Sequence, residues 1–409
     1  MKTLLILVRG DARTFYDLQQ KSILSQLPCR CVLLVDRGNR AQFESLPGAE
    51  ILETVRWKDD EQLKQQVLQL HQQYQFDGVT TLDESNVELA AELRQLLGLA
   101  GMQPEQASWF RNKVRMKQQL MAAGIRVPQF VSCSETQTVR RLLQHYGRLV
   151  IKPVDGLGSK QVVFITREDE LALWEQQHMS ELEEFEAEEF IEGDLYHVNA
   201  LVIDGIAQLT AAAAYLPGMS NIEFSSGAPF VSVIVENEEL KQRLIAHSNE
   251  VNQALQLQQG VTHLECFVTP KGEIVFVEVG LRPGGGGIVW MIESQFGINY
   301  NFAALALAAE QPELIPTPSS KPQHLAGLIG IRSHLSGFVV SSAAPQDFAK
   351  SNIQLRQIDV SAGKFSAAAA HCTDFQGLFI FDSVDGDDFD QNWREIYHTF
   401  NQKLQLNCI

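Results

Sequence analysis

The chain has 409 residues, and its 50 acidic and 33 basic residues give a formal net charge of −17. A chain of this length suggests two or more packed units. No stripe of Lys and Arg suits a nucleic-acid backbone, so we expect no nucleic-acid partner. The first apolar run, residues 4–8, is too short for a membrane span or a signal peptide and predicts a buried strand, a cytoplasmic protein and no membrane partner.

Short apolar runs alternate with longer amphipathic stretches through the first hundred residues. Strands are expected at residues 4–8, 31–35 and 78–82, with a helix at 60–74, which is the pattern of a parallel β-α-β sheet. Ligands bind such sheets beyond the carboxyl ends of the strands, where residues 9–11 and 82–85 lie. Asp83 and Ser85 could equally be helix caps.

The middle of the chain predicts one helix and then a region rich in strands. The helix runs over residues 107–123, with Gly124 and Pro128 just beyond it. Short strands and two helices, at 167–177 and 238–258, follow from residue 149, and residues 269–272 predict the turn of a hairpin. The last hundred residues mix strands and a terminal helix without an evident catalytic motif.

The six cysteines show no CxxC pair and no metal-finger spacing, so reduced thiols are expected. They are Cys29, Cys31, Cys133, Cys266, Cys372 and Cys408.

The first chemically informative stretch is the glycine-containing loop of residues 151–160. Gly156 and Gly158 allow backbone amides to approach a phosphate, and Ser159 adds a hydroxyl donor. Lys152 places a positive charge on the preceding strand. The stretch has neither the Walker pattern nor a dinucleotide fingerprint, and an ordinary hairpin remains an alternative.

A second stretch combines acidic and apolar residues before a glycine. In Glu188-Glu189-Phe190-Ile191, a strand edge could hydrogen-bond an adenine while apolar side chains enclose the ring. His197 or a carboxylate could then meet the ribose hydroxyls. The same alternation also describes any half-solvated strand.

A third stretch predicts a pair of carboxylates on two antiparallel strands. Glu265 follows His263 on one strand, and Glu278 lies on the next, shortly before Arg282. Carboxylates bridged to nucleotide phosphates commonly hold Mg²⁺. The forked guanidinium of Arg282 suits a carboxylate or an acyl phosphate. The alternative is two exposed glutamates on a hairpin.

In this order and spacing, the stretches resemble the ATP-grasp superfamily, in its carboxylate-amine ligase branch, over residues 1–310. The resemblance implies that Lys113 and Lys152 contact ATP phosphates, that residues 156–160 form a lid, and that the backbone of Glu189 and Ile191 reads adenine. It further implies metal ligation by Glu265 and Glu278. The expected ATP-binding residues are Lys113, Lys152, Gly158, Ser159, Glu188, Glu189, Phe190, Ile191 and His197; the expected substrate-binding residues are Glu84, His263, Arg282 and Gly285; and the expected catalytic residues are Lys152 and Arg282.

The implied architecture combines α/β and α+β parts in an ATP-grasp fold. It has an N-terminal parallel α/β domain (1–103), a linker helix and lid subdomain (104–190), a catalytic subdomain (191–310) and a C-terminal mixed α/β subdomain (311–409). The implied cofactors are ATP and Mg²⁺, with Mn²⁺ as a substitute. A small-molecule carboxylate would form an acyl phosphate that an amine converts to an amide. A homodimer is the expected assembly.

Two residues depart from the family pattern. Gly280 stands where many relatives have Asn as a further metal ligand, and Gln161 replaces the glycine that closes the lid. Two other functions stay open: a bicarbonate-activating enzyme of the biotin-carboxylase or carbamoyl-phosphate type, and a non-catalytic nucleotide-binding protein. Residues 216–230 are either a loop at the acceptor end of the site or a plain surface loop.

Overall fold

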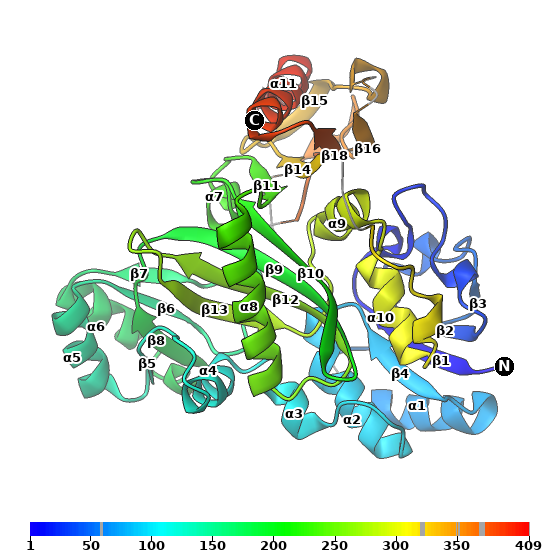
Figure 1. The fold of residues 1–409 in the computed structure, drawn as a ribbon, viewed down its shortest axis with the longest axis horizontal. Helices are drawn as coiled ribbons and strands as arrows, with labels where there is room; N and C mark the ends of the chain where they lie inside the picture. Colours follow the sequence, from blue (N-terminus) through cyan, green and yellow to red (C-terminus); the bar gives the residue numbers. More distant parts are fainter. Residues whose placement is uncertain (58–59, 320–323, 349, 351, 368–372, 409) are drawn as a thin grey trace.

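The computed structural model describes residues 1–57, 60–319, 324–348, 350, 352–367 and 373–408. Cys372 lies outside these residues. Three sheets and the helices that cover them make up most of the molecule, and a small fourth sheet lies near the C-terminus (Figure 1). Among the described residues, no helix has the length and apolar character needed to cross a membrane.

The N-terminal sheet is parallel, as the sequence predicts, with strand order β3-β2-β1-β4. Strand β1 is buried along its whole length, which explains its unbroken apolar sequence. Leu5 and Leu7 pack toward helices α1 and α2, whereas Leu4 and Ile6 pack toward α10 from the later part of the chain. The elements are β1 (Thr3–Val8), β2 (Arg30–Asp36), β3 (Ala49–Val55), α1 (Asp60–Tyr74), β4 (Gly78–Thr81), α2 (Val87–Leu97) and α10 (Tyr300–Ala308).

The helix predicted over residues 107–123 is interrupted. Helix α3 (Pro104–Ser108) ends early, and α4 (Lys113–Ala122) starts anew. The Asn112 side chain accepts hydrogen bonds from the amides of Val114 and Arg115, so it caps a new helix instead of continuing the old one. This cap places Lys113 in the first turn of α4.

A small antiparallel sheet of order β5-β8-β6-β7 follows, with α5 and α6 packed on one face. It carries residues 188–191, the stretch predicted to read adenine and called the hinge below, at the end of β8, and the predicted phosphate lysine, Lys152, on β6. The elements are β5 (Phe130–Ser132), α5 (Thr136–Tyr146), β6 (Leu149–Pro153), β7 (Val163–Ile165), α6 (Glu168–Gln177) and β8 (Phe185–Glu189).

The large antiparallel sheet has the order β13-β12-β9-β10-β11-β14-β18-β16. Helices α4 and α8 cover one face, while α9, α10 and α11 pack against the other (Figure 1). The elements are β9 (Asp194–Ile203), β10 (Ile206–Tyr215), α7 (Asn221–Ser225), β11 (Phe230–Ile234), α8 (Glu238–Ala254), β12 (Gly260–Val268), β13 (Ile274–Gly280), α9 (Ile288–Phe296), β14 (Leu325–Ile331), β16 (Ile353–Ile358), β18 (Gly377–Ser383) and α11 (Gly386–Lys403).

The large sheet continues across residue 310, because β14, β16 and β18 extend the sheet that starts with β9 to β13. The boundary expected at residue 310 therefore does not separate two sheets, and the division into four units stays a prediction. A further sheet of order β17-β15-β19 is formed by β15 (Gly337–Ser341), β17 (Phe365–Ser366) and β19 (Gln405–Cys408).

Candidate active site

Two adjoining cavities lie where the N-terminal sheet, the small sheet and the large sheet meet. The first cavity, of about 490 Å³, lies between the small and large sheets. The second, of about 670 Å³, reaches from there toward the N-terminal sheet and the glycine run of residues 284–287. The residues that line both are Leu157, Gly158, Ser159, Tyr215, Asn221, Glu265 and Glu278. The two volumes thus meet at the predicted lid and at the predicted metal carboxylates.

The predicted residues divide between the two cavities. The first cavity is lined by Lys113, Lys152, Gly158, Ser159, Glu188, Glu189, Phe190 and Ile191. The second is lined by Glu84, His263, Arg282 and Gly285. Glu265 and Glu278 line both, and His197 lines neither. The other residues expected at the nucleotide and those expected at the substrate therefore line adjoining cavities, which share the carboxylate pair together with Gly158 and Ser159.

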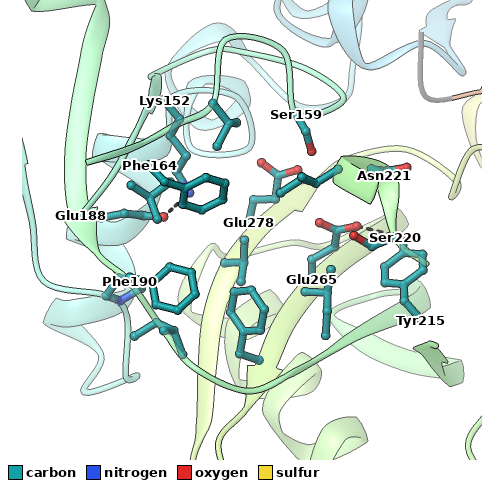
Figure 2. Close-up of a pocket in the computed structure, with 18 of the residues that line it drawn as sticks. Lys152, Ser159, Phe164, Glu188, Phe190, Tyr215, Ser220, Asn221, Glu265 and Glu278 are labelled. Atoms are coloured by element: carbon teal, nitrogen blue, oxygen red, sulfur yellow. Dashed lines mark hydrogen bonds and ion pairs between the residues drawn. The ribbon is translucent and has the colours of Figure 1, made fainter. Parts of the chain in front are cut away.

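Glu265 and Glu278 are direct partners across the β12–β13 ladder. Figure 2 shows both carboxylates pointing into the same space. The Tyr215 hydroxyl donates a hydrogen bond of 2.9 Å to Glu265 Oε1 and so fixes one of the two groups. Tyr215 was not predicted as a site residue. It lies at the end of β10 and comes close to Glu265 only because β10 and β12 both pair with β9.

Positive charge surrounds Glu278. Lys113 Nζ lies 3.2 Å from Glu278 Oε2 and donates a 2.9 Å hydrogen bond to the carbonyl of Gly156 in the predicted lid. Burial acts to raise the pKa of Glu278, but Lys113, Lys152 and Arg282 outweigh it and lower the pKa to about 2. Glu278 is therefore an anion throughout the neutral pH range.

Lys152 is held by carboxylates of the neighbouring strand. Its Nζ lies 2.6 Å from Glu188 Oε1 and 4.0 Å from Glu186 Oε1. Burial alone would lower the pKa of Lys152, yet Glu188, Glu186 and Glu278 raise it above the ordinary lysine value. Lys152 thus remains a cation although it is almost completely buried.

The apolar end of the first cavity lies beside the predicted hinge. Phe190 and Phe164 meet edge to face with 5.9 Å between ring centres, and the Arg148 guanidinium lies 3.7 Å from the centre of the Phe190 ring. Phe267 and Val277 line the opposite side from the large sheet. A flat, apolar ring is the chemical group that such walls accommodate.

The predicted lid has an unusual backbone conformation. Gly158, Ser159 and Gln161 all have φ of 58°. This left-handed region is one that glycine adopts at little cost and other residues rarely enter. Gln161 therefore keeps the backbone conformation that glycine favours at the position where the family pattern has glycine.

Arg282 is anchored beside the second cavity. Its Nε and Nη2 lie 2.9 and 2.7 Å from Glu84 Oε2, and the other Glu84 oxygen accepts a 2.9 Å hydrogen bond from Arg111. The carboxylates of Glu84, Glu278 and Glu265 raise the pKa of Arg282 despite the opposing effect of burial. Gly280 lies against this pair, since a Cβ there would lie 3.4 Å from the Glu84 carboxyl group and 3.5 Å from Arg282. A larger residue at 280 would compete with Glu84 for space.

His197, predicted as an alternative to a carboxylate for contact with ribose, lines neither cavity. His197 is fully buried, its Nε2 lies 2.7 Å from Ser232 Oγ, and Asn199 binds its Nδ1 at 2.9 Å. His197 lies on the same face of the sheet as its register partner Glu265, but the ring of Tyr215 packs 4.7 Å away and helps to cover it. Burial lowers the pKa of His197 well below its usual value, so it is neutral.

His263, by contrast, reaches the second cavity. Its Nδ1 lies 2.9 Å from Asn199 Oδ1, and its Nε2 lies 3.6 Å from Glu265 Oε1. Asn199 therefore joins His263 to the buried His197 and holds the His263 ring in one orientation.

Residues 216–230 are more than a plain surface loop. They contain the short helix α7, and the residues of this segment that line the first cavity are Leu216, Pro217, Gly218, Ser220, Asn221, Ile222 and Glu223. Ser220 and Asn221 lie beside Tyr215 and Glu265 in Figure 2. This segment therefore forms a wall where the two cavities meet.

The carboxylates of Glu265 and Glu278 suit a hard divalent cation that is bound partly by the protein and partly by a substrate. Within the described residues, no group of three or more His, Cys, Asp or Glu side chains is arranged to hold a metal ion alone. Mg²⁺ is commonly held by one or two carboxylates together with phosphate oxygens and water. Glu265 and Glu278 could supply the two carboxylates, and phosphates could lie in the adjoining cavity.

Comparison with known proteins agrees with this architecture. An ATP-grasp domain model matches residues 147–289. An L-arginine-specific L-amino acid ligase of Bacillus subtilis is 28% identical over 257 residues, covering 59% of this chain and 60% of the relative. Alanine–anticapsin ligase of Bacillus subtilis (strain 168) is 23% identical over 288 residues, covering 63% of this chain and 60% of the relative. This chain therefore matches about 60% of the length of each of these curated relatives.

The crystal structure of an L-amino acid ligase from Bacillus licheniformis superposes with a TM-score of 0.78 at 20% sequence identity. The superposition covers 100% of this chain and 99% of that one, so the fold is shared along the whole length. Residues 147–289 thus match an ATP-grasp domain, the chain has an ATP-grasp fold, and the proteins similar to it in sequence include L-amino acid ligases.

Proposed function

We propose that this protein is an ATP-dependent ligase that joins the carboxyl group of one L-amino acid to the amino group of another. The observation that carries the proposal is the carboxylate pair Glu265–Glu278, which lies where the cavity that contains Lys113 and Lys152 meets a second cavity that contains Arg282. The similarity to amino-acid ligases supports the same conclusion.

The first cavity would hold ATP. Its apolar end beside Phe190 and Phe164 suits adenine, with the backbone of Glu189 and Ile191 at the base edge. Lys113 and Lys152 would neutralise the phosphates, and Gly158 and Ser159 of the lid would cover them. Glu188 would act indirectly, because its carboxylate holds Lys152. His197 has no part in the proposal.

Glu265 and Glu278 would hold Mg²⁺, for which Mn²⁺ is a chemically similar substitute. The bound cation would neutralise charge on the transferred phosphoryl group. Tyr215 would keep Glu265 oriented, and Lys113 would keep Glu278 ionised.

The second cavity would bind the acid and the amine. Arg282 would orient the carboxylate toward the γ-phosphate, and Glu84 would fix Arg282 in place. A carboxylate oxygen bonds to the γ-phosphorus as the bond to the β,γ-bridging oxygen breaks, which gives an acyl phosphate and ADP. The amine nitrogen then bonds to the acyl carbon, phosphate leaves, and the nitrogen loses a proton.

His263 and the glycine run around Gly285 would border the two substrates in this cavity. Its volume of about 670 Å³ lies within the range of small-molecule sites and accommodates two amino acids. The homodimer and the four-unit domain division are further proposals that rest on the family resemblance.

Phosphate release from Mg·ATP, measured with amino acids singly and in pairs, tests the proposal. Release that requires an acid and an amine together is the expected result. Release with bicarbonate alone would instead assign the protein to the bicarbonate-activating enzymes. ATP binding without release under any of these conditions would support a nucleotide-binding protein without catalysis.

A further inference from the structure

Lys117 is a charged residue in the interior that the proposed chemistry does not use directly. It lies one helical turn after Lys113 on α4, so the two side chains share a face of the helix. Lys113 lines the first cavity, whereas Lys117 is fully buried and lines neither of the two cavities. A buried ammonium group is costly unless carboxylates compensate it.

Two carboxylates of β8 compensate Lys117. Its Nζ lies 2.7 Å from Glu186 Oε1 and 2.6 Å from Glu188 Oε2. Glu186 and Glu188 are two residues apart on the strand, so both point to the same face. The ring of Phe130, the register partner of Glu188, lies 4.5 Å from the same Nζ. Lys117 is thus fixed from several sides.

Glu188 carries this constraint to the active site. One of its oxygens binds Lys117, and the other lies 2.6 Å from Lys152 Nζ. Lys117, Glu188 and Lys152 therefore form a continuous line from the interior to the wall of the first cavity. Because both Glu188 oxygens are engaged, the carboxylate cannot turn without breaking one of two charge-assisted hydrogen bonds.

The charges of the cluster also balance. Lys117 and Lys152 supply two positive charges, and Glu186 and Glu188 supply two negative charges. Without Lys117, two buried carboxylates would face Lys152 alone and attract its ammonium group toward the protein interior. Lys152 would then be less available to a phosphate in the cavity.

We propose that Lys117 is a positioning residue for nucleotide binding: it fixes Glu188 and neutralises the β8 carboxylates, so that Lys152 faces the phosphates of ATP. Lys117 itself touches no substrate. This inference rests on the proposed function, which assigns Lys152 to the phosphates.

Calorimetric titration of Lys117→Met with Mg·ATP and, separately, with adenosine tests the role. Adenosine lacks phosphates, so its affinity reports the base pocket without Lys152. We expect the variant to bind ATP about tenfold or more weakly, with adenosine affinity unchanged. Gln118→Met, at an exposed position of the same helix, serves as the control and should bind both ligands like the wild type.

The double variant Lys117→Met/Glu186→Gln restores charge balance and keeps the test decisive if the single variant does not fold. Glu188 still lacks its second partner, so a smaller loss of ATP affinity, about threefold, is expected with adenosine unchanged. Wild-type ATP affinity in the folded variants, or equal losses for ATP and adenosine, would overturn the positioning role. Wild-type protein that binds no ATP would contradict the proposed function itself, and this inference with it.

Discussion

Replacing Glu278 with Gln is expected to reduce turnover about a thousandfold, which corresponds to about 4 kcal/mol of transition-state stabilisation. Gln preserves the size of the side chain and can still accept a hydrogen bond from Lys113, but it lacks the negative charge that a divalent cation requires. Glu278 lies beside Glu265 and has a pKa of about 2, so the wild-type protein always presents this charge. The initial rate of phosphate release with saturating Mg·ATP and amino acids measures the effect.

Glu239→Gln is the matched control for this variant. Glu239 is exposed on α8, away from both cavities, and its replacement should leave the rate unchanged. Thermal unfolding of the Glu278 variant should occur close to the wild-type temperature, because β13 keeps its apolar contacts. Full activity of a folded Glu278→Gln protein would rule out the metal assignment.

Replacing Arg282 with Lys is expected to reduce turnover about a hundredfold while the affinity for ATP stays the same. Lysine keeps the positive charge but loses the planar fork, which in the wild type places Nε and Nη2 on Glu84 and Nη1 on the Pro283 carbonyl and leaves further in-plane N–H donors for a carboxylate. Losing one oriented donor to a developing charge costs about a hundredfold to a thousandfold.

Steady-state kinetics with the acid substrate varied, together with ATP titration, separate the two effects for Arg282. Arg167→Lys, at an exposed position between β7 and α6, is the control. If Arg282→Lys weakened ATP binding as strongly as it slowed turnover, Arg282 would belong to the nucleotide site instead of the acid site.

The local patterns of the sequence identified many of the residues that the structure brings together at the two cavities. The carboxylate pair was predictable because Glu265 and Glu278 lie on consecutive strands of one hairpin, whose register follows from nearby residues. The lid and the hinge also lie within continuous segments of less than a dozen residues. In each case the geometry depends on short-range chain connectivity.

Residues outside such segments were missed. Lys117 becomes informative only when α4 packs against β8, which lies about seventy positions further along the chain. In the sequence, the available indication was that Lys117 lies four residues after Lys113, on the same face of a predicted helix. Arg111 reaches Glu84, which lies 27 positions earlier in the chain, and the sequence offers no reason to connect the two.

His197 shows a different limit of the sequence patterns. The alternation along β9 identifies the face of the sheet on which His197 lies, but not the side chains of β10 and β11 that cover it. The continuation of the large sheet into β14, β16 and β18 was also unpredictable, because strand pairing over such distances leaves no local pattern in the sequence.

The most direct test of the account follows oxygen from the acid into phosphate. An amino acid labelled with ¹⁸O in both carboxylate oxygens is incubated with Mg·ATP and an amine partner, and the phosphate released is analysed by mass spectrometry. Attack of the carboxylate on the γ-phosphate predicts one ¹⁸O atom in each phosphate and one retained in the amide. Phosphate released without label would contradict the acyl-phosphate mechanism and with it the proposed ligase activity.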